Sequence, residues 1–594
     1  MPTPAVPLLL GEKGVRSMSR AAVPSMPSES SSEPPSEPPG VGSPPAQRVD
    51  ATLSHGLSWE VEGSDKRKGS DEKLRSEETL AAAVQLDRPG PDGSAGDLLP
   101  DVAALKAPEW PAAVHVQDEL ELAARYAPIL MLDDREPFLP DAVGYRLFRE
   151  NAPSPSFPRE IRLEAPGASL SPDVPITLAI EYAIWWDWDI EHLYELEHVW
   201  VYVDAGGRPV RVEASWHGEW RDLRLGQAGG AVLEGTRPVV YVKPGKHALA
   251  AQPGDFEPLR DAVALVCSRL AGVGGVWVTP LFAGRLTSKT PLADRVVHTY
   301  LQGRRFVPSF SFGRRFDIGP DQLRPWEALE AAIPDRVAWW AGELARRIPP
   351  GQRRWIRIGH RGAAAHGPEN SATAVRLAAR LGADMVELDV RLTKDGVPVV
   401  IHDEVLDRVT TGQGPVADHT WEELRPLRLR DPVTGEPRDE GLMTLADALA
   451  LCREEFVGAY VDVKDGAAIP AIVAAVRQHF YPHGVVIGST RPEDVRAVRQ
   501  LAPELRVAWL VGLPVRPIPE LLAELQAMDG TYLHLCWERA GARPDQLLTP
   551  EDVAQVHRAG KGLVIWHEER PEVIAGLRQL GVDAVCSDRP ELLV

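Results

Sequence analysis

The sequence predicts an α/β chain that ends in a TIM (β/α)8 barrel, with a mainly β, sandwich-like domain and a disordered leader before it. Three observations support this prediction. From residue 355 onward, short apolar runs alternate with amphipathic helical segments, which is typical of parallel βα units. Between residues 108 and 320, aromatic and β-branched runs are separated by Gly, Pro and Asp, which favours antiparallel strands. The first 107 residues are rich in Pro, Ser, Glu and Gly.

Length, charge and cysteine content narrow the class of protein. A chain of 594 residues is too long for one ordinary domain. The net charge of -20, without a basic stripe, argues against nucleic-acid binding but is compatible with small phosphate substrates. The four cysteines are far apart, which favours a reducing compartment. We find no apolar run of membrane-spanning length and no clear signal peptide, so we expect a cytoplasmic protein. Membrane association stays open as an alternative but is not indicated, and no obligate protein partner is evident.

Three segments precede the predicted barrel. Residues 1–107 are expected to be disordered, because their composition cannot bury enough apolar surface to offset the entropy of ordering. The mainly β domain, 108–320, begins with helical spacing over Asp118–Tyr126, and its function is not indicated. Residues 321–354 read as a helical linker that is stopped by Pro349 and Pro350. The strands expected in the β domain are Ile176–Trp186, His198–Val203, Val210–Trp216 and Val239–Val242.

The β domain also resembles a known family. Glu197–Asp204, Ala214–Gly218 and Val240–Ala248 are similar to segments of the necrosis-inducing β-sandwich proteins and their vacuolar-sorting-like relatives. That resemblance implies a cation site, although the family's motif is interrupted here by an insertion. Two interpretations of the domain's polar residues remain open: they converge on a metal, or they are turn residues with satisfied hydrogen bonds. The residues in question are Asp189, Glu197, His198, His217 and His247.

The barrel segment, 355–594, contains eight candidate strands with helical patterns such as Ala372–Leu381 and Pro571–Leu580 between them. Residues 404–441 form an insertion after the second strand, where an enzyme of this architecture would set its specificity. The candidate strands are Ile356–Gly359, Met385–Val390, Tyr460–Val463, Val485–Gly488, Val507–Leu510, Tyr532–Leu535, Leu563–Trp566 and Ala584–Cys586.

Two carboxylates on the second strand give the first indication of chemistry. Side chains alternate along a strand, so Glu387 and Asp389 point to the same face. Two acids on one face of an apolar strand repel each other at neutral pH unless a cation lies between them. Only oxygen ligands are offered, which suits Mg²⁺ or Ca²⁺ better than zinc. We therefore expect a divalent cation and phosphoester chemistry at this strand.

Several motifs, in order, resemble those of the glycerophosphodiester phosphodiesterases. They are Ile358–Gly362, Pro368–Ser371, Gly382–Gly396, Val399–Asp403, Met443–Leu449, Tyr460–Lys464 and Ser587–Leu593. The resemblance spans residues 355–594 and implies a metal-dependent hydrolase of glycerophosphodiesters or related lysophospholipids, yielding an alcohol and glycerol 3-phosphate. The alternative is a binding or targeting protein that uses the barrel only as a scaffold. Retention of the complete catalytic set argues against that alternative.

Barrel enzymes place their active sites at the C-terminal ends of the strands, so the predicted site residues share one rim. We expect the cation on Glu387, Asp389 and Asp462, and acid/base catalysis by His360 and His402 without assigning which histidine is the acid. Arg361 and Lys464 would add positive charge at the phosphoryl oxygens. Glu369 and Trp566 are assigned to substrate binding, Glu369 by orienting Arg361 or the metal shell. A purely structural salt-bridge cluster is the alternative for the buried charges.

Two departures from the family pattern concern substrate choice more than chemistry. The family's ligand on the third strand is usually Glu, whereas Asp462 is one methylene shorter. The seventh strand commonly ends in a run like Trp-Thr-Val-Asn, but here Trp566 is followed by His567, Glu568 and Glu569. Trp566 therefore keeps a hydrophobic wall for the glycerol or the head group, whereas the polar residues that follow it are changed.

Overall fold

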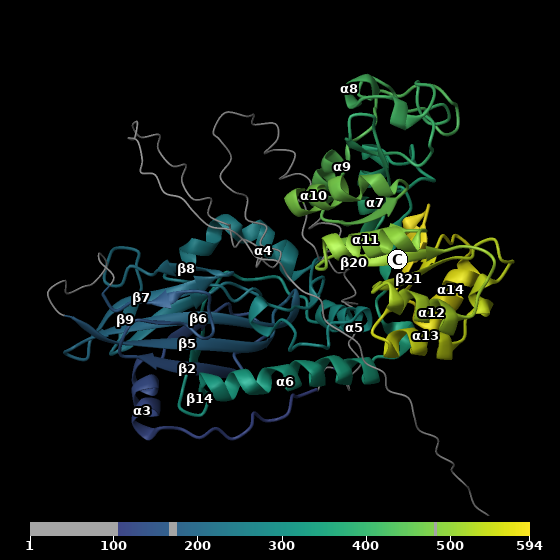
Figure 1. Ribbon diagram of the computed structural model, residues 1–594. Helices are drawn as coiled ribbons and strands as arrows, with labels where there is room; N and C mark the ends of the chain where they lie inside the picture. Colours follow the sequence, from purple (N-terminus) through teal and green to yellow (C-terminus); the bar gives the residue numbers. More distant parts are fainter. Residues whose placement is uncertain (1–101, 103–104, 165–174, 480–483) are drawn as a thin grey trace, which may run out of the picture. The chain divides into compact units, whose positions relative to one another are not determined.

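The computed structural model describes residues 102, 105–164, 175–479 and 484–594 (Figure 1). Nearly all of the predicted disordered leader, residues 1–101 and 103–104, lies outside the described residues.

The β domain is built from two sheets that share one hydrophobic core. The larger sheet has seven strands in the order β14-β2-β5-β6-β7-β8, with β12 paired to β6, and the smaller has five in the order β11-β10-β1-β13, with β9 paired to β10. Core residues come from both, for example Ile184 and Val201 from the larger sheet and Leu130 and Val240 from the smaller. The larger sheet comprises β2 (Ala142–Phe148), β5 (Ile176–Trp188), β6 (His192–Asp204), β7 (Pro209–Trp216), β8 (Glu219–Asp222), β12 (Gly275–Val276) and β14 (Leu323–Pro325).

The remaining elements of this domain flank the sheets. The smaller sheet comprises β1 (Ile129–Leu132), β9 (Val232–Glu234), β10 (Arg237–Val242), β11 (Leu249–Ala250) and β13 (Arg314–Asp317), and β3 (Ala152–Pro153) pairs with β4 (Glu160–Ile161). The helices are α3 (Gln117–Tyr126), α4 (Arg260–Cys267), α5 (Pro291–Gln302) and α6 (Trp326–Arg347). Helix α6 lies along β2 (Figure 1), and β14 pairs with β2, so the segment predicted as a linker packs on the β domain.

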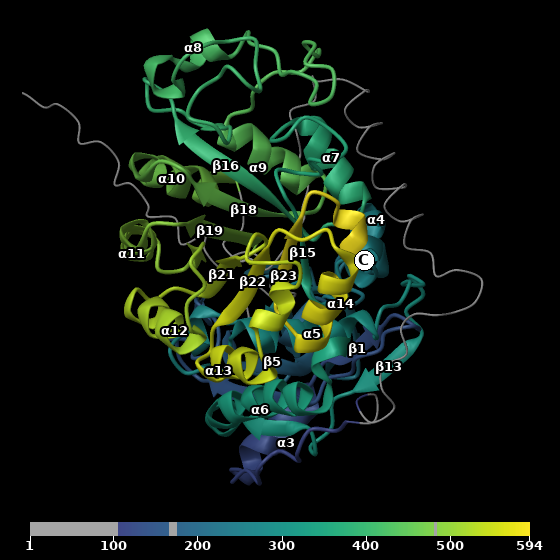
Figure 2. The same cartoon turned by 90° about the vertical axis from the view of Figure 1, so that its right-hand side faces the viewer.

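Eight parallel strands form a closed barrel, which confirms the predicted fold class. Their order is β15-β23-β22-β21-β20-β19-β18-β16, and β15 also pairs with β16, which closes the ring. Figure 2 shows most of these strands side by side. They are β15 (Ile356–Gly359), β16 (Met385–Leu392), β18 (Gly458–Val463), β19 (Val485–Ser489), β20 (Arg506–Val511), β21 (Tyr532–Cys536), β22 (Gly562–Trp566) and β23 (Ala584–Ser587).

Each predicted barrel strand falls within two residues of the observed one, because short apolar runs bounded by turn residues mark buried parallel strands directly. The helices that follow them are α7 (Ala372–Arg380), α9 (Leu445–Glu454), α10 (Ile469–His479), α11 (Pro492–Leu501), α12 (Ile518–Ala527), α13 (Pro550–Arg558) and α14 (Pro571–Leu580). A short strand, β17 (Pro398–Val400), pairs antiparallel with the end of β16 and leads into the insertion. The insertion contains α8 (Trp421–Leu424) and an apolar cluster of its own around Leu406 and Val416.

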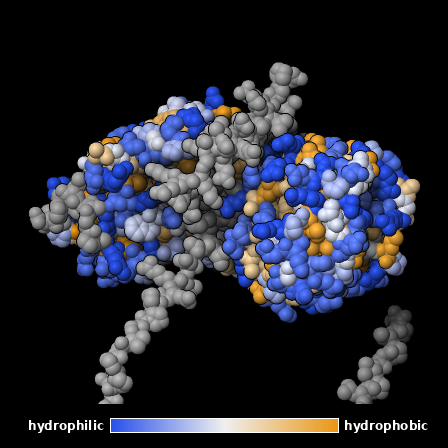
Figure 3. All heavy atoms as spheres, turned by 90° about the horizontal axis from the view of Figure 1, so that it is seen from above, coloured by the Kyte–Doolittle hydropathy of each residue, from blue (hydrophilic) through white to orange (hydrophobic). Residues whose placement is uncertain are grey.

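Hydrophobic residues on the molecular face in Figure 3 are scattered among hydrophilic ones. Scattered exposed apolar side chains are normal on a folded protein and do not by themselves mark a binding surface. Within the described part of the chain, none of the helices combines the length and the apolar character that a bilayer span requires.

The start of α13 offers a test of local stability away from the site. Thr549 and Asp552 form a capping box, in which the Thr549 hydroxyl accepts from the Asp552 amide and the Asp552 carboxylate accepts from the Thr549 amide. Thr549→Ala should therefore weaken the first turn by about 1 kcal/mol, so its amides exchange roughly fivefold faster with solvent deuterium. Thr549→Ser keeps the hydroxyl and should exchange like the wild type. Equal acceleration in both variants would contradict the prediction.

Candidate active site at the mouth of the barrel

Three buried carboxylates meet at the C-terminal ends of neighbouring strands. Glu387 and Asp389 are on β16, and Asp462 is on β18, where the strand register places it directly opposite Asp389. All three residues are at most 1% exposed. One oxygen from each carboxylate lies within 4.8 Å of the others. The structure thus brings together the three predicted cation ligands.

Burial and mutual repulsion make this cluster costly without a cation. Burial raises the pKa of Glu387 well above its usual value, and the charges of Asp389 and Asp462 raise it further. Glu387 Oε2 accepts a hydrogen bond from the Arg361 amide at 2.9 Å, whereas the buried Oε1 has no hydrogen-bond partner among the described residues. A set of three carboxylates with an orphaned buried oxygen fits a hard divalent cation.

Lys464 lies directly on the carboxylates. Its Nζ is 2.8 Å from Asp389 Oδ1 and 2.5 Å from Asp462 Oδ2. Burial alone would raise the pKa of Asp389, but Lys464 and then Arg361 outweigh burial and hold that pKa below its usual value. Lys464 therefore offsets part of the negative charge, and three acids still face two basic side chains.

The loop after β15 holds its functional residues in unusual backbone conformations. Arg361 and Asn370 have φ angles of 50° and 59°, in the left-handed region that non-glycine residues rarely adopt. Arg361 reaches Glu369 through Nη1 at 2.8 Å and Asp389 through Nε at 3.2 Å. Asn370 donates to Asp389 Oδ2 at 2.7 Å and accepts from the Asp389 amide at 3.2 Å. Ser371 is the N-cap of α7, and its hydroxyl accepts a hydrogen bond from the Ala374 amide.

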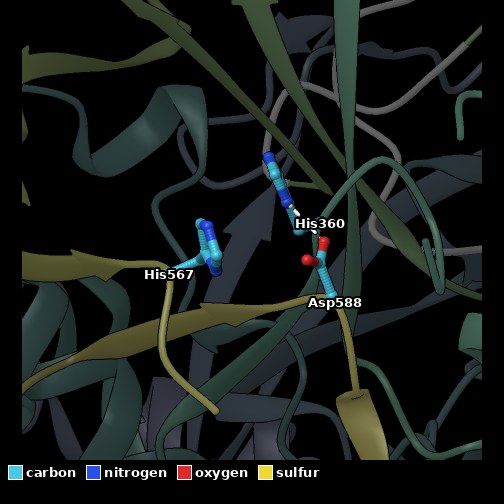
Figure 4. A group of neighbouring side chains, drawn as sticks. All are labelled: His360, His567 and Asp588. Carbon is cyan, nitrogen blue, oxygen red and sulfur yellow. Dashed lines mark hydrogen bonds and ion pairs between the residues drawn. The ribbon is translucent and has the colours of Figure 1, made fainter. Parts of the chain in front are cut away.

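Each of the two candidate histidines is held by an aspartate through the same ring nitrogen. His360 Nδ1 is 2.6 Å from Asp588 Oδ1 (Figure 4), and His402 Nδ1 is 2.8 Å from Asp403 Oδ1. The pKa values of both aspartates are lowered, so both carboxylates are ionised and accept only; each Nδ1 therefore donates, leaving Nε2 as the basic nitrogen.

The two imidazoles differ in exposure. The side chain of His360 is 6% exposed and that of His402 is 33% exposed. Burial lowers the pKa of His360, which favours its neutral form. Its Nε2 lies 4.0 Å from Glu387 Oε2 and makes no hydrogen bond within the described residues. A neutral, unbonded Nε2 beside the carboxylate cluster is available to take a proton from a nucleophile.

The end of β22 forms a wall beside His360. The Trp566 ring centroid is 5.0 Å from that of His360, and His567 stacks on His360 at 4.9 Å with an angle of 15° between the rings (Figure 4). Glu569 accepts hydrogen bonds from His567 Nδ1 at 3.0 Å and from the Asp588 amide at 2.9 Å. This carboxylate thus ties the loop after β22 to the one after β23, where Asp588 holds His360.

Some functional contacts were not predicted from the sequence. Asp588 lies inside the motif Ser587–Leu593, but nothing local indicates a partner 228 residues earlier in the chain. Arg408, in the insertion, binds Glu369 and Asp403 together. A sequence signal existed only for Asp403, which directly follows His402.

In the β domain, the five polar residues considered for a metal do not meet at one point. Glu197 groups with Glu195 and His217, and Asp189 groups with His192 and Glu195. Lys246 Nζ lies 2.7 Å from both Asp189 and Glu191, so a lysine already supplies positive charge there.

The other two histidines of that set differ, because His247 interacts electrostatically with Asp189 and Glu197 whereas His198 does not. His198 follows Glu197 on β6, points to the opposite face and contacts Ser156 at 3.0 Å. His247 stacks on Trp186 at a ring-centroid distance of 4.6 Å. The five residues therefore do not share one site, whereas the groups that contain Asp189, Glu197 and His217 stay compatible with a cation.

Glu387 should destabilise the cation-free protein at neutral pH. Folding raises the pKa of the Glu387 carboxyl above its ordinary value of 4.5. The stability that this carboxyl contributes in its protonated form is therefore lost as the pH rises from 4.5 through the pKa of the folded state. Glu387→Gln should therefore raise the melting temperature in EDTA at pH 7–8 and remove the further rise that Mg²⁺ or Ca²⁺ gives the wild type.

Glu369→Gln is the contrasting variant on the same rim. Burial raises the pKa of Glu369, but Arg408 and Arg361 outweigh it, so the pKa is lowered and the ionised form stabilises the fold above pH 4.5. This variant should lower the melting temperature at neutral pH in EDTA. A lowered melting temperature for Glu387→Gln as well would contradict the prediction.

Comparisons with known proteins match the barrel. The model of the glycerophosphoryl diester phosphodiesterase family matches residues 360–592. A glycerophosphodiester phosphodiesterase of Caldanaerobacter subterraneus is 31% identical over 243 residues, which is 40% of this chain and 95% of that protein. Glycerophosphodiester phosphodiesterase 1 of Mus musculus is 42% identical over 154 residues, 24% of this chain and 45% of that protein.

A solved structure of the glycerophosphodiester phosphodiesterase from Agrobacterium tumefaciens is 26% identical, with a TM-score of 0.36, and covers 40% of this chain and 98% of that chain. The resemblance of the β domain to necrosis-inducing proteins stays a prediction. For the barrel, the identity and coverage of the Caldanaerobacter relative decide the question: the chain belongs to the glycerophosphoryl diester phosphodiesterase family.

Proposed function

We propose that the barrel hydrolyses glycerophosphodiesters, or the related lysophospholipids, to an alcohol and glycerol 3-phosphate, with one bound divalent cation and two catalytic histidines. One observation carries the proposal. In a chain of this family, His360 and His402 are each fixed by an aspartate, beside three buried carboxylates that include an orphaned oxygen. A scaffold without activity has no need of this arrangement, which disfavours a purely binding role.

Glu387, Asp389 and Asp462 would hold the cation, either Mg²⁺ or Ca²⁺. Once bound, such an ion supplies charge stabilisation at the phosphoryl oxygens during displacement. Arg361 contributes a guanidinium at the same rim, tethered by Glu369 and Asp389. Lys464 offsets the charge of Asp389 and Asp462, and its amine would be the second positive group at the phosphoryl oxygens.

The two imidazoles divide the proton transfers. One removes the proton from the attacking hydroxyl, whether of water or of the substrate's own glycerol, and the other protonates the leaving alkoxide. Holding Nδ1–H on an aspartate directs Nε2 to the substrate and stabilises the imidazolium that forms. Trp566 would provide an apolar wall for the glycerol or the head group.

The purified chain should release alcohol from glycerophosphocholine or an artificial diester, and EDTA should abolish turnover. His360→Ala and His402→Ala should each lower kcat roughly 10²–10⁴-fold, because each removes a proton-transfer group. Coupled detection of glycerol 3-phosphate measures the reaction, and circular dichroism checks that the variants fold. Full activity in either folded variant would contradict the two-histidine mechanism, and an inactive wild type across a head-group panel would favour the scaffold role.

Asp588→Asn should lower kcat without removing cation binding. An asparagine that turns its Nδ2 toward His360 donates where Asp588 accepts, which moves the imidazole proton to Nε2 and leaves no base facing the substrate. We expect a loss of roughly 10²-fold or more in kcat, with the Mg²⁺ or Ca²⁺ thermal shift retained. Wild-type kcat in Asp588→Asn would show that this aspartate does not set the tautomer.

A further inference from the structure

We propose that Arg408, supplied by the insertion, is a positioning residue that aligns His402 and Arg361 at the same time. It stands in the middle of a chain of alternating basic and acidic side chains, Arg361–Glu369–Arg408–Asp403–His402, which joins the loop after β15 to the loop after β17. This inference rests on the proposed function, because it concerns how that site is held in its working geometry.

The contacts of Arg408 are bidentate on both sides. Its Nη1 and Nη2 donate to the two oxygens of Glu369 at 2.8 and 2.7 Å. Its Nε and Nη2 donate to the two oxygens of Asp403 at 2.5 and 3.0 Å. A planar guanidinium suits two carboxylates in this way, whereas a lysine ammonium, a point charge, does not.

Glu369 and Asp403 each contact a second side chain of the candidate site. Glu369 Oε1 also accepts from Arg361 Nη1 at 2.8 Å, and Asp403 Oδ1 also meets His402 Nδ1 at 2.8 Å. With four hydrogen bonds made to these two residues, Arg408 has little donor capacity left for a substrate. Its role is therefore to orient the groups that act, and not to bind the substrate itself.

The need for such a clamp follows from the charges. Glu369 and Asp403 are close enough to share one guanidinium, so without it two carboxylates repel each other at the rim. Hydrogen bonds from Arg408 are the largest cause that lowers the pKa of each of them. An Asp403 that turns away would release His402 Nδ1, and His402 is already 33% exposed. The tautomer of His402 and the orientation of its ring would then be undetermined.

The insertion fixes Arg408 in turn. Two residues before it, Leu406 is fully buried in the insertion's own apolar cluster, and two residues after it, Thr410 is also fully buried and bonds the Leu406 carbonyl at 2.8 Å. Between these two buried residues, the side chain of Arg408 is 51% exposed. The insertion thus supplies a side chain that holds two carboxylates at the rim.

The test compares Arg408→Gln with Arg425→Gln in the full-length protein. Arg425 lies in the same insertion, is 64% exposed and has an ion pair with Glu422, away from the rim chain. Arg408→Gln should lower kcat roughly 10- to 100-fold, because misalignment of an acid/base group by about 1 Å costs that much. Arg425→Gln should keep wild-type kcat, and both should keep the Mg²⁺ or Ca²⁺ thermal shift.

Two further arms separate positioning from a general structural effect. Asp403→Asn combined with Arg408→Gln should lower kcat by less than the product of the two single losses, because the two variants share their effect on His402. In Arg408→Gly, added guanidinium at millimolar concentration should restore part of kcat, since the site is exposed. Fully additive losses of activation free energy in the double variant would overturn the inference. Wild-type kcat in Arg408→Gln, together with no effect of guanidinium on Arg408→Gly, would overturn it as well.

A readout without turnover distinguishes this inference from the proposed function. Histidine-selective nitrogen NMR should show a His402 Nδ1–H signal in the wild type that is lost in Arg408→Gln and kept in Arg425→Gln. An active wild type whose His402 signal persists in Arg408→Gln overturns the positioning role alone. A wild type inactive on every diester, with the signal lost as expected, overturns the proposed function and leaves the alignment itself demonstrated.

Discussion

The site depends on the repulsion between three carboxylates that are withdrawn from water. Strand pairing sets Asp389 opposite Asp462, and the alternation of β16 adds Glu387 on the same side. Three neighbouring residues offset this concentration of negative charge: Lys464 lies on two of the acids, Asn370 donates to Asp389, and the Arg361 amide donates to Glu387. Such an arrangement costs folding free energy and is retained at functional sites.

The concentration of negative charge also explains the backbone conformation of the loop after β15. A left-handed conformation at Arg361 directs its amide to one acid and its guanidinium to another, so one residue serves two partners. Left-handed Asn370 likewise gives and receives a hydrogen bond with Asp389. Strain in the loop is offset by charge-assisted hydrogen bonds, which are among the stronger ones available to a protein.

Local patterns allowed the barrel and the acid cluster to be predicted from the sequence. Buried parallel strands are continuous apolar runs, so their limits were visible, and two acids at i and i+2 must share a face. The pairing of Asp588 with His360 was not visible, because it depends on ring closure between the last strand and the first. The site of Arg408 depends on how an irregular insertion folds back. In the β domain, strand alternation alone already separates Glu197 from His198.

The aspartate that fixes His360 arrives at the far end of the chain. β15 is the first strand of the barrel and His360 directly follows it, but Asp588 follows β23, the eighth barrel strand, which pairs with β15. Unless β23 pairs with β15, the His360 imidazole has no Asp588 acceptor for its Nδ1 proton. A barrel that is open at this seam would therefore keep its three acids on β16 and β18 and still lack an oriented histidine.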